Sequence, residues 1–150
     1  MITFIRTDSS NPDFSLLVEL LDAYLAKKDG RDHEYYNKFN TIDKLKNVVV
    51  CLENGVPMAS GGIKEFDVST MEVKRMFTTP ESRGKVFALR VLAELETWAA
   101  ELGYKRCMLE TGKRQVEAVA LYKKKGYCIT PNYDQYIGME NSLCFKKGLK

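Results

Sequence analysis

Two cations and a glycine stand where a helix of this chain is expected to begin. They are Arg83, Gly84 and Lys85 in the segment RGKVFA, which follows a strand-like run and Pro80. The first turn of a helix carries unpaired backbone N–H groups and the positive end of the helix dipole, so added cations oppose the dipole unless an anion binds among them. A pyrophosphate would satisfy both the N–H groups and the cations. In the alternative, Arg83 and Lys85 are surface cations and Gly84 only loosens the helix start.

The strand before this turn is unusually charged for its expected place. The run TMEVKRMFT, Thr70 to Thr78, contains Glu72, Lys74 and Arg75 and is expected in the centre of a sheet. Central strands that are covered on both faces are almost continuously apolar. Charged residues there indicate a cleft, and the alternative is a half-exposed strand with a structural ion pair.

These segments resemble the GNAT superfamily of N-acetyltransferases. The family's acetyl-CoA motif has the form Arg/Gln-x-x-Gly-x-Gly/Ala, and here it reads RGKVFA, Arg83 to Ala88. The strand LETG and the helix QVEAVALYKKKGY follow in the order and spacing of a bacterial branch of the family. The similarity covers residues 48 to 147 well and the N-terminal helices only in outline.

The resemblance implies a place for acetyl-CoA. The helix start would bind its pyrophosphate, and the backbone of the preceding strand would pair with the pantetheine arm like an added strand. An N–H of that strand would also polarise the thioester carbonyl. Gln115 stands where the family commonly has an asparagine that hydrogen-bonds the pantetheine, and Tyr122 matches a tyrosine near the sulfur. The implied cofactor-binding residues are Met76, Phe77, Thr78, Arg83, Gly84, Lys85, Val86, Phe87, Ala88, Gln115 and Tyr122.

Val86 departs from the motif, because it replaces the first glycine. A missing side chain at that position lets the backbone approach phosphate closely. Valine can adopt helical angles and keep its N–H available, but its methyl groups would push the pyrophosphate outward. We therefore expect weaker acetyl-CoA binding than a glycine would give.

Acetylation of an amine requires a base and an acid. An amine of pKa ~10 must lose a proton before it attacks, and a thiolate of pKa ~8.5 must leave, if ordinary side-chain values are a guide. Glu72, directly or through a water, is the candidate base, and Tyr122 is the candidate acid. Glu110 in LETG is a rival base, since it also lies late in a central strand and a bulge at the cleft would remove the strand parity that could decide. The alternative for Tyr122 is packing on the apolar face of its helix.

The polar segment TPNYDQYIGMEN, residues 130 to 141, is a candidate wall of the acceptor pocket. Its Tyr133, Asp134 and Tyr136 suit a cationic amine, and an ordinary surface loop is equally open. Lys123 to Lys125 are expected to form a solvated helix face.

The remaining pattern predicts the elements that would position these residues. Ser15 to Lys27 read as a helix, with a second helical piece around residues 34 to 40, and Asn54-Gly55 between apolar runs indicates a hairpin. Apolar residues recur at helical spacing from Ala88 to Leu102, and the link from Glu72 to Glu110 is long enough for a right-handed crossover. The predicted fold is a single α/β (α+β) domain over residues 1–150. Its mixed, mostly antiparallel sheet of six to seven strands is splayed at the cofactor cleft, with about four helices on both faces.

Composition favours an ordinary cytoplasmic domain. The 150 residues carry a formal net charge of +3, which falls short of the basic stripe typical of nucleic-acid binding. No segment reads as a membrane span or a targeting signal. The four cysteines are widely spaced and expected to be reduced, and the single His33 has no second histidine for a metal site. We therefore expect a cytoplasmic location and no metal.

The resemblance, taken with these patterns, implies an N-acetyltransferase that moves acetyl from acetyl-CoA to a primary amine of a small molecule or peptide. Direct attack is expected, because no cysteine lies in the motif strand or beside a histidine that could activate it. One alternative is a non-catalytic acyl-CoA-binding module that acts through a partner protein, and another is a domain for a different nucleotide. The identity of the amine and assembly as a homodimer stay open.

Overall fold

A seven-stranded mixed sheet forms the centre of the protein, in the strand order β1-β2-β3-β4-β5-β7-β6. The computed structural model describes residues 1–29, 44–82 and 86–149. Neighbouring strands are antiparallel except for the parallel pair β4 and β5, so the predicted mixed sheet is confirmed. The strands are β1 (Ile2–Thr7), β2 (Asn47–Glu53), β3 (Val56–Asp67), β4 (Thr70–Thr78), β5 (Arg106–Gly112), β6 (Cys128–Thr130) and β7 (Ser142–Gly148).

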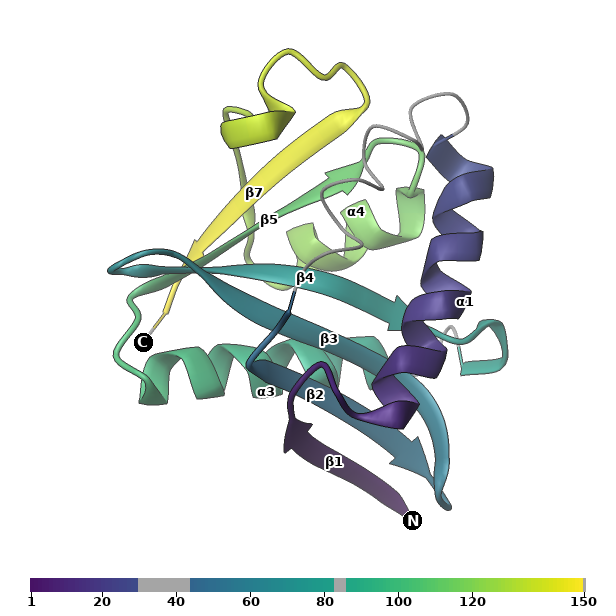
Figure 1. Cartoon of the computed structure of the whole chain (residues 1–150). Helices are drawn as coiled ribbons and strands as arrows, with labels where there is room; N and C mark the ends of the chain where they lie inside the picture. Colours follow the sequence, from purple (N-terminus) through teal and green to yellow (C-terminus); the bar gives the residue numbers. More distant parts are fainter. Residues whose placement is uncertain (30–43, 83–85, 150) are drawn as a thin grey trace.

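Three α-helices lie within the described residues: α1 (Pro12–Asp29), α3 (Phe87–Glu101) and α4 (Val116–Lys124). About four were expected, and the one not found here, the helical piece expected around residues 34 to 40, lies outside the described residues. Helices α1 and α3 cover opposite faces of the sheet (Figure 1). The sequence of β2 is continuously apolar because both faces of this strand are covered. Val48 packs in the cluster with α1, and Val49 packs in the cluster with α3.

Local signals set the turns and helix ends. Asn54 and Gly55 both have positive φ, +53° and +82°, which is the requirement of a two-residue hairpin turn. Helix α1 begins earlier than Ser15 because Asn11 Oδ1 accepts a hydrogen bond from the Phe14 N–H at 3.0 Å, an N-cap. Gly103, with φ +95°, follows the end of α3, as a left-handed glycine commonly does.

The sheet opens between its two parallel strands. The β4–β5 ladder contains only the pairs from Thr70↔Arg106 to Glu72↔Met108. Beyond Glu72 the two strands diverge, and α4 lies on the far side of the opening (Figure 1). The predicted splay is therefore present, and it begins at the residue expected to act as the base.

A bulge in β4 lies just beyond this point. Ser60 pairs with Phe77 and Gly62 pairs with Lys74, so Gly61 faces two residues, Arg75 and Met76. Arg75 has φ +61°, an uncommon backbone conformation for a residue other than glycine. In a regular strand Val73 and Phe77 would share a face. Here Val73 packs with α3 and Phe77 packs with α1, because the extra residue reverses the alternation.

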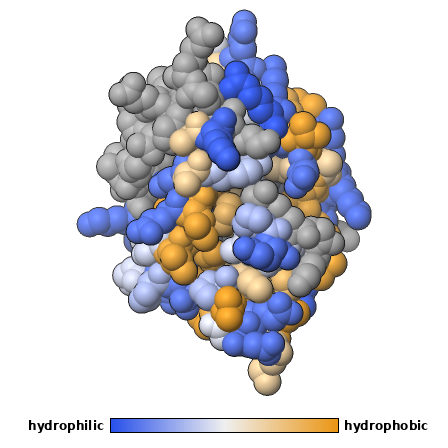
Figure 2. All heavy atoms as spheres, turned by 90° about the vertical axis from the view of Figure 1, so that its right-hand side faces the viewer, coloured by the Kyte–Doolittle hydropathy of each residue, from blue (hydrophilic) through white to orange (hydrophobic). Residues whose placement is uncertain are grey.

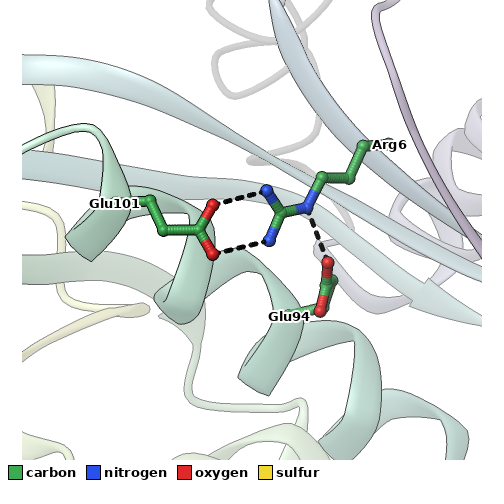
Figure 3. Close-up of polar contacts among 3 residues, drawn as sticks. All are labelled: Arg6, Glu94 and Glu101. Carbon is green, nitrogen blue, oxygen red and sulfur yellow. Dashed lines mark hydrogen bonds and ion pairs between the residues drawn. The ribbon is translucent and has the colours of Figure 1, made fainter.

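Arg6 connects the edge strand β1 to α3 through ion pairs. Its Nε lies 2.6 Å from Glu94 Oε2 and its Nη1 lies 2.7 Å from Glu101 Oε1 (Figure 3). Its guanidinium also lies 4.9 Å from the centre of the Trp98 ring. The hydrogen bond from Arg6 lowers the pKa of the Glu101 carboxyl below its ordinary value of 4.5. The charged form of Glu101 is therefore favoured by folding.

We expect Arg6→Met to lower the melting temperature at pH 7 by roughly 1–3 °C, the small effect usual for exposed ion pairs. Because the pKa of Glu101 is lowered in the folded state, its contribution is present above pH 4.5 and disappears as the pH falls through the lowered value. Urea unfolding of both proteins at pH 7 and pH 3 measures this difference. A gap that widens as the pH falls would contradict the assignment of the stabilisation to this carboxylate.

Candidate active site

Two joined cavities occupy the opening between β4 and β5. The smaller has a volume of about 80 Å³ and contains side chains of Glu72, Arg75 and Glu110 in its lining. The larger, about 720 Å³, extends along the end of β4 to the start of α3 and along α4. Figure 2 shows the molecule from the side to which the strands diverge, with hydrophobic side chains gathered near the middle of that face among hydrophilic ones. The residues common to both linings are Leu21, Met76, Gln115 and Tyr122.

Glu72 and Glu110 reach the smaller cavity from two neighbouring strands. Glu72 is the last β4 residue of the parallel ladder, and Glu110 lies two residues beyond its partner Met108. Val73 follows Glu72 and Leu109 precedes Glu110, and both apolar residues pack in the cluster with α3. Because side chains alternate along a strand, both carboxyl groups point to the opposite face of the sheet. The two candidate bases therefore share one cavity.

Tyr133 orients the Glu72 carboxylate. Its hydroxyl donates a hydrogen bond to Glu72 Oε2 at 2.9 Å, and its ring packs edge-on against Phe66 and Tyr136. Burial, followed by the charge of Glu72, raises the pKa of Tyr133, so this phenol stays a donor at neutral pH. A carboxylate that is 9% exposed and held by a neutral donor has a fixed direction toward the cavity.

The rest of the loop segment contributes unevenly. Tyr136 lines the smaller cavity, and burial, with the charges of Glu110 and then Glu72, raises its pKa. Asp134 has φ +46° in a short 3₁₀ turn, η3 (Asp134–Tyr136), and lines neither cavity. The segment thus supplies two tyrosines to the site, and Asp134 does not reach it.

Tyr122 enters the site from the other side of the sheet. It lies on α4 and packs against Tyr127 and Phe145, with ring centres 5.8 Å and 6.1 Å away, so the packing role considered for it is real. It also lines both cavities, which the split between β4 and β5 makes accessible from the α4 side. Burial, and after it the negative charge of Glu110, raises the pKa of the Tyr122 phenol. This group therefore keeps its proton at neutral pH and is available as a donor.

Most described members of the predicted cofactor set gather along the larger cavity. From Val73 to Thr78, β4 pairs with β3 on one side, and no other strand of the described residues pairs with its second side. That side is a template for an extended chain. Phe87 is an exception, because its side chain is buried in the core at 2% exposure. Arg83, Gly84 and Lys85 lie outside the described residues. The predicted members that line the larger cavity are Met76, Phe77, Thr78, Val86, Ala88, Gln115 and Tyr122.

Helix α1 contributes residues that the sequence did not identify. Leu21 lines both cavities, Leu25 lines the smaller and Tyr24 lines the larger. Asp22 of the same helix pairs with Arg75, with Nη1 2.6 Å from Oδ1. The spacing of Leu21, Tyr24 and Leu25 indicates that they share one helix face. It does not indicate that this face lies against β4, about fifty residues later in the sequence. The half exposure that the alternative gave to β4 was wrong, because Thr70 to Lys74 are all buried. Its structural ion pair is present for Arg75, with Asp22 of α1 as the partner.

Other residue types play no visible part in the site. Cys51, Cys107 and Cys144 are buried in strands, Cys128 is exposed, and all four are free thiols. Burial raises the pKa of Cys107 to about 12, which makes it a poor nucleophile. Within residues 1–29, 44–82 and 86–149 no cluster of three His, Cys, Asp or Glu side chains is suited to a metal ion. The helices of these ranges include none that is long and apolar enough to cross a membrane.

A mixed sheet that splits between its two parallel strands, with a long groove beside the split, is the arrangement that the sequence resemblance predicts. The chain belongs to the acetyltransferase (GNAT) family, whose model matches residues 14–127. It is 30% identical over 150 residues to the IAA acetyltransferase of Azospirillum brasilense, covering 99% of this chain and 98% of that protein.

Solved structures show the same fold. A protein from Klebsiella pneumoniae that is classed with the acyl-CoA N-acyltransferases matches with a TM-score of 0.85 and 24% identity, covering 100% of this chain and 99% of that one. A GNAT family acetyltransferase from Elizabethkingia anophelis, solved with acetyl-CoA bound, matches with a TM-score of 0.68 and 18% identity, covering 99% and 98%. The predicted family and fold are confirmed.

Proposed function

We propose that this protein transfers acetyl from acetyl-CoA to a primary amine by direct attack. The observation that carries the proposal is the meeting of Glu72, Glu110 and Tyr122 where a polar cavity joins a long groove. The family relationship and the similarity to an acetyltransferase solved with acetyl-CoA support the choice of donor. Location in the cytoplasm and assembly as a homodimer stay predictions.

The larger cavity is the proposed seat of acetyl-CoA. The pantetheine arm would lie along Met76 to Thr78 and use the side of β4 that faces away from β3. Gln115, at the start of α4, would hydrogen-bond the arm. The pyrophosphate would lie at the start of α3, near Val86 and Ala88, and Arg83 to Lys85 are predicted to assist.

Separate groups on the two sides of the opening would carry out the two proton transfers. Glu72, held by Tyr133, takes a proton from the acceptor ammonium, directly or through a water, and Glu110 is the alternative base. The amine nitrogen then forms a bond to the thioester carbon, and the carbon–sulfur bond breaks. Tyr122 gives its proton to the departing sulfur and is reprotonated from solvent or from the new amide nitrogen. An N–H of β4 near the carbonyl oxygen would stabilise its developing charge.

Ligand binding and turnover test this proposal separately. Acetyl-CoA at about 100 times its dissociation constant should stabilise the fold by about 2.7 kcal/mol, or roughly 5–10 °C, whereas ATP and GTP should not. Release of coenzyme A thiol with a panel of primary amines should exceed the rate without amine. Stabilisation without release would favour the non-catalytic module, and stabilisation by ATP or GTP alone would favour the other nucleotide.

Val86→Gly is expected to bind acetyl-CoA several-fold more tightly than the wild type. A gain in affinity of this size corresponds to about the net free energy of one hydrogen bond. Val86 lines the larger cavity and is 54% exposed. Its φ of −82° is one that both valine and glycine adopt, so the substitution should leave the backbone conformation unchanged. Calorimetry measures the change, with Val116→Gly at the start of α4 as the same substitution outside both linings. Equal or weaker binding by Val86→Gly would show that the valine side chain is harmless.

A further inference from the structure

Four side chains lie where the two cavities of the opening meet. The residues that line both cavities are Leu21, Met76, Gln115 and Tyr122. In the proposed function, coenzyme A occupies the larger cavity and the attacking amine enters the smaller one, so the acyl group must lie at this junction. The space that the four side chains leave there determines which acyl groups fit, because a shaped pocket discriminates between chains that differ by a methylene group.

Met76 is the junction residue whose position depends on the neighbouring strand. Leu21 is 5% exposed and packs in the cluster with α1. The Tyr122 ring is held by its packing against Tyr127 and Phe145. Met76 is partly buried and packs against the cluster with α3. Because a methionine side chain is unbranched and can adopt many shapes, the groups beside it decide where its sulfur lies.

Gly61 of β3 leaves the space that the Met76 side chain fills. The bulge places Gly61 opposite Arg75 and Met76. A methyl carbon on Gly61 would overlap Met76 Sδ and would lie 3.4 Å from Met76 Cγ and 3.1 Å from Leu95 Cδ1. Carbon atoms normally pack ~3.5–4.0 Å apart. The φ of Gly61 is outside the left-handed region, so the Met76 side chain, and not the backbone, requires glycine at this position.

A displaced Met76 side chain could move in one direction. Leu95 of α3 is completely buried, and the backbone of Gly61 is enclosed between β2 and β4. A close-packed interior leaves no room for a shift toward either of them. On its remaining side Met76 borders the two cavities. A larger residue at position 61 would therefore push the thioether of Met76 into the junction, and Gly61 keeps it out.

We propose that Met76 and Gly61 together limit the length of the acyl group that the protein transfers. Met76 is the wall of the acyl pocket, and Gly61 is the residue that positions this wall. The inference rests on the proposed function and adds selectivity for the acyl donor. The transfer itself is the same for every chain length: the amine nitrogen bonds to the acyl carbon, the carbon–sulfur bond breaks, and the sulfur receives a proton.

A series of acyl donors tests the inference by turnover and by binding. Coenzyme A release with acetyl-CoA, propionyl-CoA and butyryl-CoA gives three kcat/KM values with one amine, and calorimetry gives the three affinities without any amine. We expect the wild type to favour acetyl-CoA over butyryl-CoA by about 10-fold or more, since one methylene in a shaped pocket changes kcat/KM by about 10- to 200-fold. Met76→Ala removes the wall and should lower this preference by about 10-fold, because butyryl-CoA then fits.

Gly61→Ala should have the opposite effect through Met76. The displaced thioether takes up space at the junction, so the preference for acetyl-CoA over butyryl-CoA should rise several-fold. The double variant Gly61→Ala/Met76→Ala has no thioether to displace and should show the same preference as Met76→Ala alone. Such non-additivity indicates direct coupling of the two positions. The affinity for coenzyme A itself, which has no acyl group, should change little in all three variants.

Gly62→Ala is the matched control, because it makes the same substitution at the next residue of β3. A methyl carbon there would lie 2.6 Å from Leu45 Cδ1 and 3.4 Å from Val48 Cγ2, and neither residue lines a cavity. This variant crowds the core in a different place, so it should lower the melting temperature and keep the wild-type preference. Met76→Ala tests the proposal by itself if Gly61→Ala fails to fold.

The outcomes separate this inference from the proposed function. An unchanged preference in Met76→Ala or in Gly61→Ala, or a double variant that behaves like Gly61→Ala, would overturn the inference and leave the acetyltransferase. Binding that favours acetyl-CoA over butyryl-CoA in the wild type and not in Met76→Ala, without transfer to any amine, would support the acyl wall and overturn the proposed reaction.

Discussion

Tyr122→Phe is expected to lower kcat for acetyl transfer by about 100-fold or more, while the affinity for acetyl-CoA changes little. A positioned general acid typically contributes about 10²- to 10⁴-fold to a rate. Phenylalanine keeps the ring that packs against Tyr127 and Phe145, so the substitution removes the hydroxyl and leaves the packing of α4 intact. Because burial raises the pKa of this phenol, wild-type Tyr122 carries its proton at every pH at which the protein would be assayed.

Steady-state kinetics and calorimetry together measure this effect. Tyr104→Phe is a matched control, since Tyr104 donates its hydrogen bond to Glu65 and lines neither cavity. It should keep the wild-type kcat. Unchanged turnover in Tyr122→Phe would remove this residue from the mechanism, and a parallel loss of acetyl-CoA affinity would mean that it binds the coenzyme instead.

Glu72→Gln is expected to lower kcat/KM at neutral pH by about 100-fold, the lower end of the range for loss of a general base. Glutamine has nearly the same shape and still accepts the hydrogen bond from Tyr133, so the loop keeps its attachment to β4. Its amide oxygen does not take up a proton at neutral pH. Glu110→Gln should cause a smaller loss, because it is the Glu72 carboxylate that Tyr133 orients by a hydrogen bond.

The pH dependence distinguishes a base from a structural residue. As the pH rises toward the pKa of the free amine, ~10, more of the acceptor arrives already deprotonated, and the need for a base falls. The rate of Glu72→Gln should therefore approach that of the wild type at high pH. A deficit that is the same at all pH values would assign Glu72 a structural role, and a larger loss in Glu110→Gln would make Glu110 the base.

Much of the architecture could be predicted, because it follows from short-range chemistry. The Asn54-Gly55 turn needs two positive φ angles that this dipeptide adopts readily, and Gly103 ends α3 for a similar reason. The crossover from β4 to β5 follows from chain length and handedness. These signals depend on residues that are close in the sequence, so these turns, helix ends and connections can be predicted from a single sequence.

The site was predictable only in part, because its decisive contacts join distant segments. Glu72, Glu110 and Tyr122 were identifiable by type and by family resemblance, and the structure brings them to one opening. The bond between Tyr133 and Glu72 spans 61 residues, and the pair of Arg75 with Asp22 spans 53. No periodicity encodes such partners. A bulge at the cleft was considered as a possibility, but its location at Arg75 depends on how β3 and β4 align, which the strand residues alone do not determine.

Strand β7 lies between β5 and β6 although both precede it in the chain, and this order has a consequence for synthesis. While the ribosome is still making residues 142–148, β5 has no antiparallel neighbour, and the loop that carries Tyr133 and Tyr136 has no β7 to anchor it. The nascent polypeptide therefore completes the smaller cavity, which Tyr136 lines, after the larger one. A product truncated in that loop would expose the bare rim of β5, which is the kind of surface that recruits other unfinished chains into aggregates.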